Sequence, residues 1–453
     1  MGARAEPAVS PALRAPRRLE PEWLYFLAMG IWVVMRTVPL TVFHDLMTDG
    51  LFKVLSYLTL LLLVAFEVAY GIRELRRCQS SRDASTAGPV EWAVPDTRDD
   101  RRAARRADFS ALLETTYAKV TVIAIPIVVA LFLILKVNNN GRFPQYVLLF
   151  VFCARNIDFR RVARFGLVMS VAILAVMVAL CVLGVAEDFI VTYPDPRPRH
   201  CLGFLWPLYP GMLVFNITAL TLYLGGMRES KRTTGALFAL NLVILWLCSP
   251  RLSTMLALLM IALCVSLRFD AFARLVRRAS PLLVWSFVII GALCIVLAFA
   301  YDYYPDALAE ANGVFGSRIR YGNEAITTYG ITPFGQTVEM RGYGKALGTG
   351  TDLEEIEASY FYIDSTYIQY LVRQGVVALV ALVGAYTVTA HEARRSGDWT
   401  LLLILTILAM HLAIDDLTTR LQFNTMILET GGAVSSVAGR LVERYWPSAR
   451  ERA

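Results

Sequence analysis

The sequence predicts an all-α polytopic membrane protein with about twelve transmembrane helices of about 20 residues each. Of the 453 residues, 56% are hydrophobic and only 18% are charged, whereas a soluble globular chain is about 45–50% apolar and about 25% charged. The mean hydropathy is +0.52, and apolar runs recur along almost the whole chain. These observations exclude an ordinary cytosolic enzyme, a disordered scaffold and a histone-like basic protein.

The apolar runs place the expected spans in one integral-membrane domain, residues 1–453. The first run is too long for a cleaved signal peptide, and Arg36 interrupts it. The fourth run is short and the twelfth is weakly hydrophobic. The spans are expected at 23–43, 54–70, 119–137, 145–159, 162–185, 205–224, 235–249, 252–268, 282–301, 362–389, 399–416 and 421–438.

Basic residues predict the orientation of these spans. With the N-terminus inside, most of the 44 Lys and Arg residues fall in cytoplasmic segments, as the positive-inside bias requires. The even number of spans then places both termini in the cytoplasm. Removing one span would move the later basic clusters outside.

Two connecting loops are long. Residues 71–118, with RELRRC and DDRRAARRAD, form a basic cytoplasmic loop suited to anionic headgroups. The loop lacks the aromatic interleaving and folded motifs of nucleic-acid binders, so no nucleic-acid partner is expected. Residues 302–361 face outward and are rich in aromatic residues. Loops of this length are usually functional.

Arginines in the predicted outer segments run against the positive-inside bias. A guanidinium presents a planar fork of donors that matches phosphate oxygens, so the cluster predicts binding of a lipid-linked phosphate or pyrophosphate. The alternative is that each arginine pairs with a nearby carboxylate or lipid headgroup. The arginines are Arg197, Arg199, Arg251, Arg318, Arg320 and Arg341.

Ionisable residues within the predicted spans form a second group, because such residues are costly in hydrocarbon. Arg36 and Glu429 could neutralise each other between helices. His411 and Asp415, with Asp416 beside them, have i, i+4 spacing on one helix face. That pair is either a general base with its orienting carboxylate or a hydrogen-bonded pair between helices.

The outer loop and the span after it carry a recognisable pattern. The run SRIRYGNEAITTYGITPFGQTV, followed by YIDSTYIQYLVRQGVVAL, resembles the signature of Wzy-type polysaccharide polymerases, in the O-antigen ligase and polymerase superfamily. The matching positions are Arg318, Tyr329-Gly330-Ile331, Phe334-Gly335, Asp364-Ser365-Thr366-Tyr367 and Gly375-Val376.

A second segment, RHCLGFLWP, is similar to the stretch that precedes the sixth span in that family. It supplies Arg199, His200, Gly203 and Phe204. Where the family often continues with His-Pro-Asn, this chain has Trp206-Pro207-Leu208. Together the motifs cover about 70 residues, and hydropathy supports the rest of the resemblance.

The resemblance implies a GT-C-like, metal-independent glycosyltransferase that needs no cofactor. Its donor would be a glycan on undecaprenyl pyrophosphate, and its acceptor the terminal sugar of another lipid-linked repeat unit. Membrane lipids, a flippase and a chain-length regulator would be its partners. The location implied is the bacterial plasma membrane, with the reaction at the outer face.

The departing pyrophosphate needs positive charge. The candidate substrate-binding residues are Arg199, Arg251, Arg318, Arg320, Arg341 and Tyr367. The acceptor hydroxyl needs a base, for which the candidates are Asp364, Glu357, His200 and His411. We favour Asp364, which lies on the matched motif beside Tyr367. The alternative role of Asp364 is to cap the helix of the tenth span.

Two other functions compete. An O-antigen-type ligase would move the glycan onto a different acceptor, and the Tyr-Gly-Ile and Phe-Gly run favours the polymerase. A secondary transporter also suits twelve spans. Transporters, however, usually divide into related halves that bind substrate near the midplane. Here the largest outer loop falls after the ninth span, and the arginines gather at the outer face.

Overall fold

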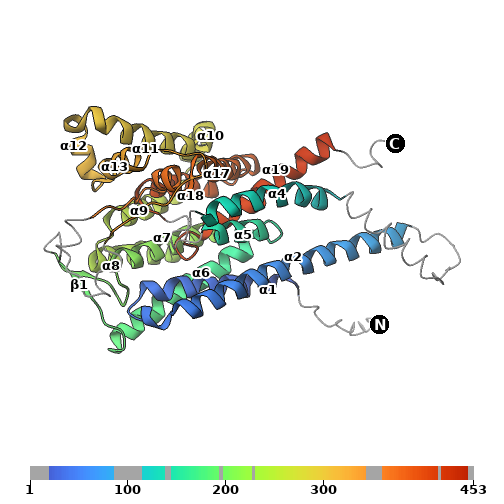
Figure 1. The fold of residues 1–453 in the computed structure, drawn as a ribbon, viewed down its shortest axis with the longest axis horizontal. Coiled ribbons are helices and arrows are strands. Elements are labelled where there is room, and N and C mark those ends of the chain that lie inside the picture. The colour runs from blue at the N-terminus through green and yellow to red at the C-terminus, as the bar shows by residue number, and fades with distance from the viewer. Residues whose placement is uncertain are drawn as a thin grey trace, which may run out of the picture.

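The computed structural model describes residues 20–85, 115–137, 144–192, 197–226, 230–342, 360–416 and 420–446. These residues form a helical bundle in which most helices run along the long axis of the molecule (Figure 1). The strands in the described ranges are β1 (Ile190–Val191) and β2 (Arg199–His200), which pair antiparallel. The predicted all-α class is confirmed for the described part of the chain.

The longer helices alternate with short connections and breaks. Short 3₁₀ turns at Val38–Leu40 and His44–Leu46 join the first two helices. The α-helices are α1 (Glu22–Thr37), α2 (Asp49–Ser85), α4 (Thr116–Val137), α5 (Pro144–Ala154), α6 (Phe159–Val182), α7 (Leu208–Gly225), α8 (Lys231–Cys248), α9 (Arg251–Ser266), α10 (Asp270–Val284), α11 (Ser286–Tyr303), α12 (Pro305–Val314), α13 (Arg318–Tyr329), α16 (Thr366–Gln369), α17 (Val376–Ser396), α18 (Trp399–Ile414) and α19 (Glu429–Tyr445).

The chain is a multi-pass membrane protein. Eight helices in the described ranges are long and apolar enough to cross a membrane. Helices α9 and α10 form a ninth candidate as a pair, with a bend of 111° between them. Helices α5 and α18, where the fourth and eleventh spans were expected, are apolar but shorter. Twelve spans therefore stay a prediction.

Two expected spans are interrupted. Residues 362–389 contain α16, a π-helix at Tyr370–Gln374 and a break at Gly375 before α17. Residues 421–438 begin as irregular chain with a 3₁₀ turn at Thr425–Leu428, and only then continue as α19. In addition, α10 occupies the connection expected between the eighth and ninth spans. Hydropathy responds to composition and does not register where the backbone breaks.

A polar cluster in the core provides hydrogen-bond partners for the irregular chain before α19. Helix α7 is largely buried, and its Asn216 side chain donates to Ser170 Oγ, Gln422 O and Thr425 Oγ1, each at 3.1 Å. The Asn216 Oδ1 atom accepts from Thr425 N at 3.1 Å. Irregular backbone at membrane depth is tolerated only where protein or water supplies such partners. Asn216 therefore allows a non-helical segment to pass through the core.

The break at Gly375 is packed against residues 332–336, which carry the Phe-Gly motif. Gln336 N donates to Arg373 O at 3.0 Å, and Val376 N donates to Thr332 O at 3.1 Å. The Gln336 side chain also donates to Tyr329 O at 2.8 Å. Carbonyl and amide groups freed by the helix break thus find partners in the loop.

Gly375→Ala is expected to lower the free energy of unfolding by about 2–5 kcal/mol, through overpacking and a strained backbone. Gly375 has a φ of +89°, and an added Cβ would overlap Gly335 N and lie 2.5 Å from Pro333 O. Unfolding of the purified protein measures the effect. The control is Gly384→Ala in α17, where an added Cβ has nothing within 4 Å. Equal stability of the two variants would contradict this packing.

Candidate active site

The start of α13 presents Arg318 to the segment that precedes α16. The Arg318 Nη2 atom lies 3.3 Å from Asp364 Oδ2. Its Nε donates to Ile414 O at 2.7 Å, and its Nη1 donates to Phe315 O at 3.0 Å. The two side chains are 19% and 23% exposed, so the ion pair is held by the protein and still open to a ligand. The structure thus joins two motif residues that are far apart in the sequence.

The local sequence explains how Arg318 reaches this position. Gly316 and Ser317 both have positive φ, at 59° and 62°, and turn the chain sharply between α12 and α13. A Cβ at Gly316 would lie 2.7 Å from Arg318 Nη1. The buried Asn312 accepts from Arg320 N at 3.0 Å through its side chain, which fixes the first turn of α13. Glycine therefore leaves the space that the guanidinium occupies.

A second arginine–carboxylate pair lies beyond the end of α18. Arg420 Nη2 is 3.7 Å from Asp416 Oδ2, and the guanidinium carbon lies 5.5 Å from the centre of the Tyr209 ring. Tyr362 donates its hydroxyl to the same Asp416 oxygen at 3.2 Å. The buried Arg420 Nη1 atom has no hydrogen-bond partner. A phosphate oxygen is the kind of acceptor that this atom suits.

The two pairs belong to one site. Thr366 in the first turn of α16 donates its hydroxyl to Asp415 O at 2.6 Å. Asp415 in turn accepts from Asp416 N at 2.8 Å through its side chain. The chain around Asp364 therefore lies against the chain at the end of α18. We call Arg318, Asp364, Asp416 and Arg420 the arginine–carboxylate cluster.

Sequence reasoning missed Arg420. The available signal was an arginine directly before the expected span 421–438, in a short segment that the sequence predicts to face outward, where positive charge runs against the usual bias. Its partner Asp416 lies only four residues earlier in the chain, so the i, i+4 spacing of the two residues was a second signal.

Aromatic groups border the cluster. Tyr360 lies 5.2 Å from Tyr321 between ring centres. Burial, and then the negative charge of Asp364, raise the pKa of Tyr360 well above its usual range. Its phenol therefore stays protonated and can donate a hydrogen bond. Tyr367, expected to contact substrate, is instead buried and donates to Ala409 O at 3.0 Å. Its ring also packs against Gly291, so its role is to hold α16 in place.

His411 is not the base with an orienting carboxylate that the spacing suggested. Its helix ends at Ile414 and Asp415 is extended, so the i, i+4 geometry does not apply. His411 Nε2 lies 3.0 Å from Ser253 Oγ, and its Nδ1 atom has no hydrogen-bond partner. The ring is fully buried and stacks on Phe215 with 4.0 Å between centres. These contacts describe a core histidine.

A histidine with an orienting carboxylate does occur in the hairpin after α6. His200 Nδ1 lies 2.7 Å from Asp188 Oδ2, and Asp188 Oδ1 accepts from Leu202 N at 2.7 Å. The imidazole is 35% exposed. Sequence reasoning named His200 and missed Asp188. The pairing of Ile190 with His200 between the two strands brings Asp188 and His200 together.

The expected pair of Arg36 and Glu429 does not form. The guanidinium carbon of Arg36 lies 5.9 Å from the centre of the Phe52 ring, near Gln422, which donates to Arg36 O. Glu429 begins α19, where its neighbouring charges are those of Asp398 and Asp158. The two residues thus lie in different parts of the bundle.

The remaining candidate site residues lie at separate positions in the structure. Arg199 lies over Trp206, with 5.8 Å between guanidinium carbon and ring centre. Arg251 begins α9 and is exposed. Arg320 is exposed and donates to the Tyr321 hydroxyl at 3.0 Å. Arg341 is exposed and forms a β-bridge with Phe361. Glu357 lies outside the described residues.

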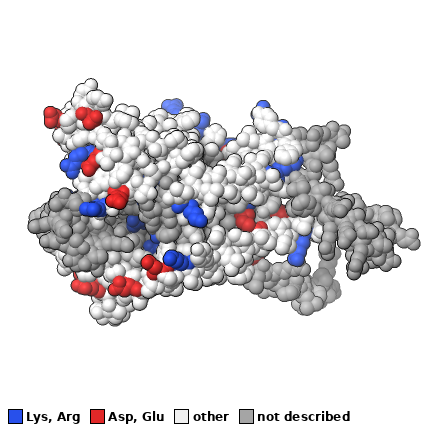
Figure 2. All heavy atoms as spheres, in the orientation of Figure 1, with Lys and Arg blue, Asp and Glu red and all other residues white. Residues whose placement is uncertain are grey.

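The site offers positive charge mainly from arginine. Within the described ranges, no group of three or more His, Cys, Asp or Glu side chains could hold a metal ion. On the face seen in Figure 2, acidic and basic residues gather at the end that carries α12 and α13.

Comparisons with family models, with curated proteins and with solved structures return no match for this chain.

Proposed function

We propose that the protein polymerises lipid-linked oligosaccharide repeat units into a surface polysaccharide. The reaction would take place at the outer face of the bacterial plasma membrane, with both termini in the cytoplasm. The arginine–carboxylate cluster is the observation that carries this proposal. It places two guanidinium groups next to two carboxylates, at the meeting point of the segments that resemble the Wzy-type signature.

The cluster has the groups that the transfer requires. The donor loses its bond between the sugar and the pyrophosphate, and a new glycosidic bond forms to the acceptor hydroxyl oxygen. Arg318 and Arg420 would stabilise the negative charge that develops on the departing pyrophosphate. Asp364 would accept the proton of the acceptor hydroxyl. Asp364 and Arg318 are in contact. The group that would accept the proton and a group that would stabilise the departing pyrophosphate therefore lie within a few ångströms of each other.

The direct test is to supply the purified protein with lipid-linked oligosaccharide as the only substrate. A ladder of products that differ by one repeat unit is the expected result. Transfer only to a different added acceptor would identify a ligase. Uptake of the substrate into vesicles without new glycosidic bonds would identify a transporter and reject polymerisation.

The orientation can be tested by labelling engineered cysteines with a membrane-impermeant thiol reagent. Ala309→Cys in α12 is expected to react in intact cells, because α12 belongs to the proposed outer loop. Ser85→Cys at the end of α2 is expected to react only after the membrane is opened. The parental protein supplies the background from native cysteines. Labelling of the Ser85 site in intact cells would overturn the proposed orientation.

A further inference from the structure

Helix α10 turns away from the long axis of the bundle, at the end remote from the candidate site. The bend of 111° after α9 sets α10 nearly perpendicular to the helix before it. Helix α9 begins beside the site, where its Ser253 lies 3.0 Å from His411. Figure 1 shows α10 at the end of α11 that is remote from α12 and α13. The helix packs there against α17 and α18, so protein covers one of its faces.

Two rows of mainly apolar side chains run along α10. Val276, Ser280 and Val284 are buried and form the row that contacts the bundle. Leu275 and Leu282 form a second row and are 58% and 64% exposed. Their spacing of seven residues places them on one face of the helix. On a membrane protein, such an exposed apolar row suits the boundary of the acyl chains.

A basic row lies on the remaining face of α10. Arg274, Arg277 and Arg278 are exposed and recur at spacings of three and four residues. Asp270 lies one turn before Arg274 and offsets its charge. Arg277 and Arg278 leave a net positive charge on this face, and neither forms an ion pair with another described residue.

The carboxylates of the helices that pack against α10 are used elsewhere. On α17, Glu392 accepts a hydrogen bond from Arg440 of α19 at 2.6 Å. At the start of α18, Asp398 caps the first turn of that helix. The guanidinium groups of Arg277 and Arg278 are therefore open to an anionic group from outside the protein.

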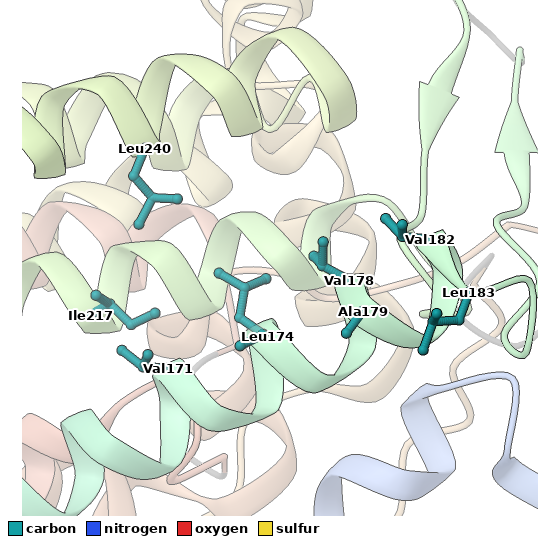
Figure 3. A pocket seen from close by; sticks show the side chains of 9 residues that line it. Val171, Leu174, Val178, Ala179, Val182, Leu183, Ile217 and Leu240 are labelled. Carbon is teal, nitrogen blue, oxygen red and sulfur yellow. The ribbon is translucent and has the colours of Figure 1, made fainter.

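A hollow elsewhere on the bundle shows the contrast. It has a volume of about 670 Å³ between α6, α7 and α8, and apolar side chains such as Val171, Val178 and Leu240 line it (Figure 3). The hydrocarbon of any lipid can fill such a hollow, because its lining offers no charge that would select a headgroup. Helix α10 differs, since its basic row can select a lipid by charge.

Helix α10 does not suit a place inside the bilayer. Helix α9 alone has 16 residues, about 24 Å of helix, which is most of a hydrocarbon core about 30 Å thick. Continuing that span through α10 would carry Arg277 and Arg278 into hydrocarbon, where charged side chains are costly. An apolar row beside a basic row is typical of a helix that lies in the membrane interface.

We propose that α10 lies in the plane of the membrane surface and binds anionic phospholipid headgroups through Arg277 and Arg278. Leu275 and Leu282 then reach the upper part of the acyl chains, and the exposed Trp285 after the helix lies at headgroup level. The inference stands independently of the proposed function. In the proposed orientation this surface belongs to the cytoplasmic leaflet, whose anionic lipids attract basic residues.

Spin labels test the position of α10 in full-length protein in lipid nanodiscs. Nitroxides attached through Leu275→Cys, Leu282→Cys and Arg278→Cys report depth by collision with oxygen and with a water-soluble nickel complex. Leu275 and Leu282 are about 10 Å apart along the helix, yet an in-plane helix places both at the same depth in hydrocarbon and Arg278 on the water side. A depth that changes steadily along α10 would show a broken span, and water at all three positions would show a surface for another protein. Either result overturns the proposal.

Photocrosslinking tests the headgroup. Phosphatidylglycerol and phosphatidylcholine, each with a diazirine near the headgroup end of one acyl chain, are compared in nanodiscs that contain equal amounts of both. The phosphatidylglycerol probe should label α10 peptides in preference. Arg277→Gln combined with Arg278→Gln should lower this preference about tenfold, because two basic residues near the surface are lost. Equal labelling by the two probes in the parental protein would reject the binding of anionic headgroups.

The matched control is Lys231→Gln combined with Arg232→Gln, which removes two adjacent exposed cations from the start of α8. The variants are compared at equal amounts of folded protein. The control should keep the parental preference at α10, since the net charge changes equally but α10 is intact. An equal fall in both double variants would show that net charge attracts the lipid, and would overturn the role of α10.

Discussion

Arg318→Ala is expected to slow the formation of longer glycan chains by about 100-fold or more, the usual cost of removing one group that stabilises developing negative charge. Arg318 is the charged partner of Asp364 and is anchored by Ile414 O and Phe315 O, so it is preorganised for this task. The measurement is the rate of ladder formation by purified protein, normalised to folded protein.

Two further variants separate charge, geometry and folding. Arg318→Lys keeps the charge and loses the planar fork of donors, so it should restore activity only in part. Arg274→Ala removes an exposed arginine from α10, which carries no residue of the site, and should have little effect. Full activity in Arg318→Ala at normal protein levels would remove this residue from the site.

Asp364→Asn is expected to lower turnover by about 100-fold or more if Asp364 takes the acceptor proton. An amide cannot act as a base at neutral pH, yet it has nearly the same shape. The alternative role as a helix cap would survive this change, because Asn caps a helix about as well as Asp. The described ion pair of Asp364 is with Arg318.

A matched control for this prediction is Glu324→Gln, which removes an exposed carboxylate from α13. Its turnover should stay close to that of the parental protein. Unfolding measurements on both variants exclude a loss of structure. Near-parental turnover in Asp364→Asn would show that another group takes the proton, and His200 with its Asp188 partner would be the next residue to replace.

Sequence reasoning located two residues of the site but not their arrangement. Arg318 and Asp364 were both selected from the matched pattern, and the structure places them 3.3 Å apart. Arg420 and Asp188 were missed. Arg420 lies four residues after Asp416, and only the fold shows that it also packs against the distant Tyr209 ring. Asp188 meets His200 through the pairing of β1 with β2.

The interrupted spans show the same limit. Residues 362–389 are apolar enough overall to have been expected as one membrane helix, yet they contain a π-helix and a glycine with a φ of +89°. The break is stabilised because Thr332 accepts a hydrogen bond from Val376 N and Gln336 donates to the carbonyl groups of Arg373 and Val372. Hydropathy is averaged over neighbouring residues, so it does not include hydrogen-bond partners that lie about 40 residues away in the sequence.

The sequence by itself determined that this protein is a multi-pass helical membrane protein, because the transfer of apolar segments into hydrocarbon depends on composition within about 20 residues. It also identified the arginine and carboxylate residues in the segments between the apolar runs. The tertiary structure alone decided which of these groups meet. It buried His411 against Phe215 and Ser253, placed Arg420 over the ring of Tyr209, and brought Arg318 to Asp364. Such pairings depend on how distant helices pack and on which buried polar groups can be satisfied, so they arise only when the whole chain is folded.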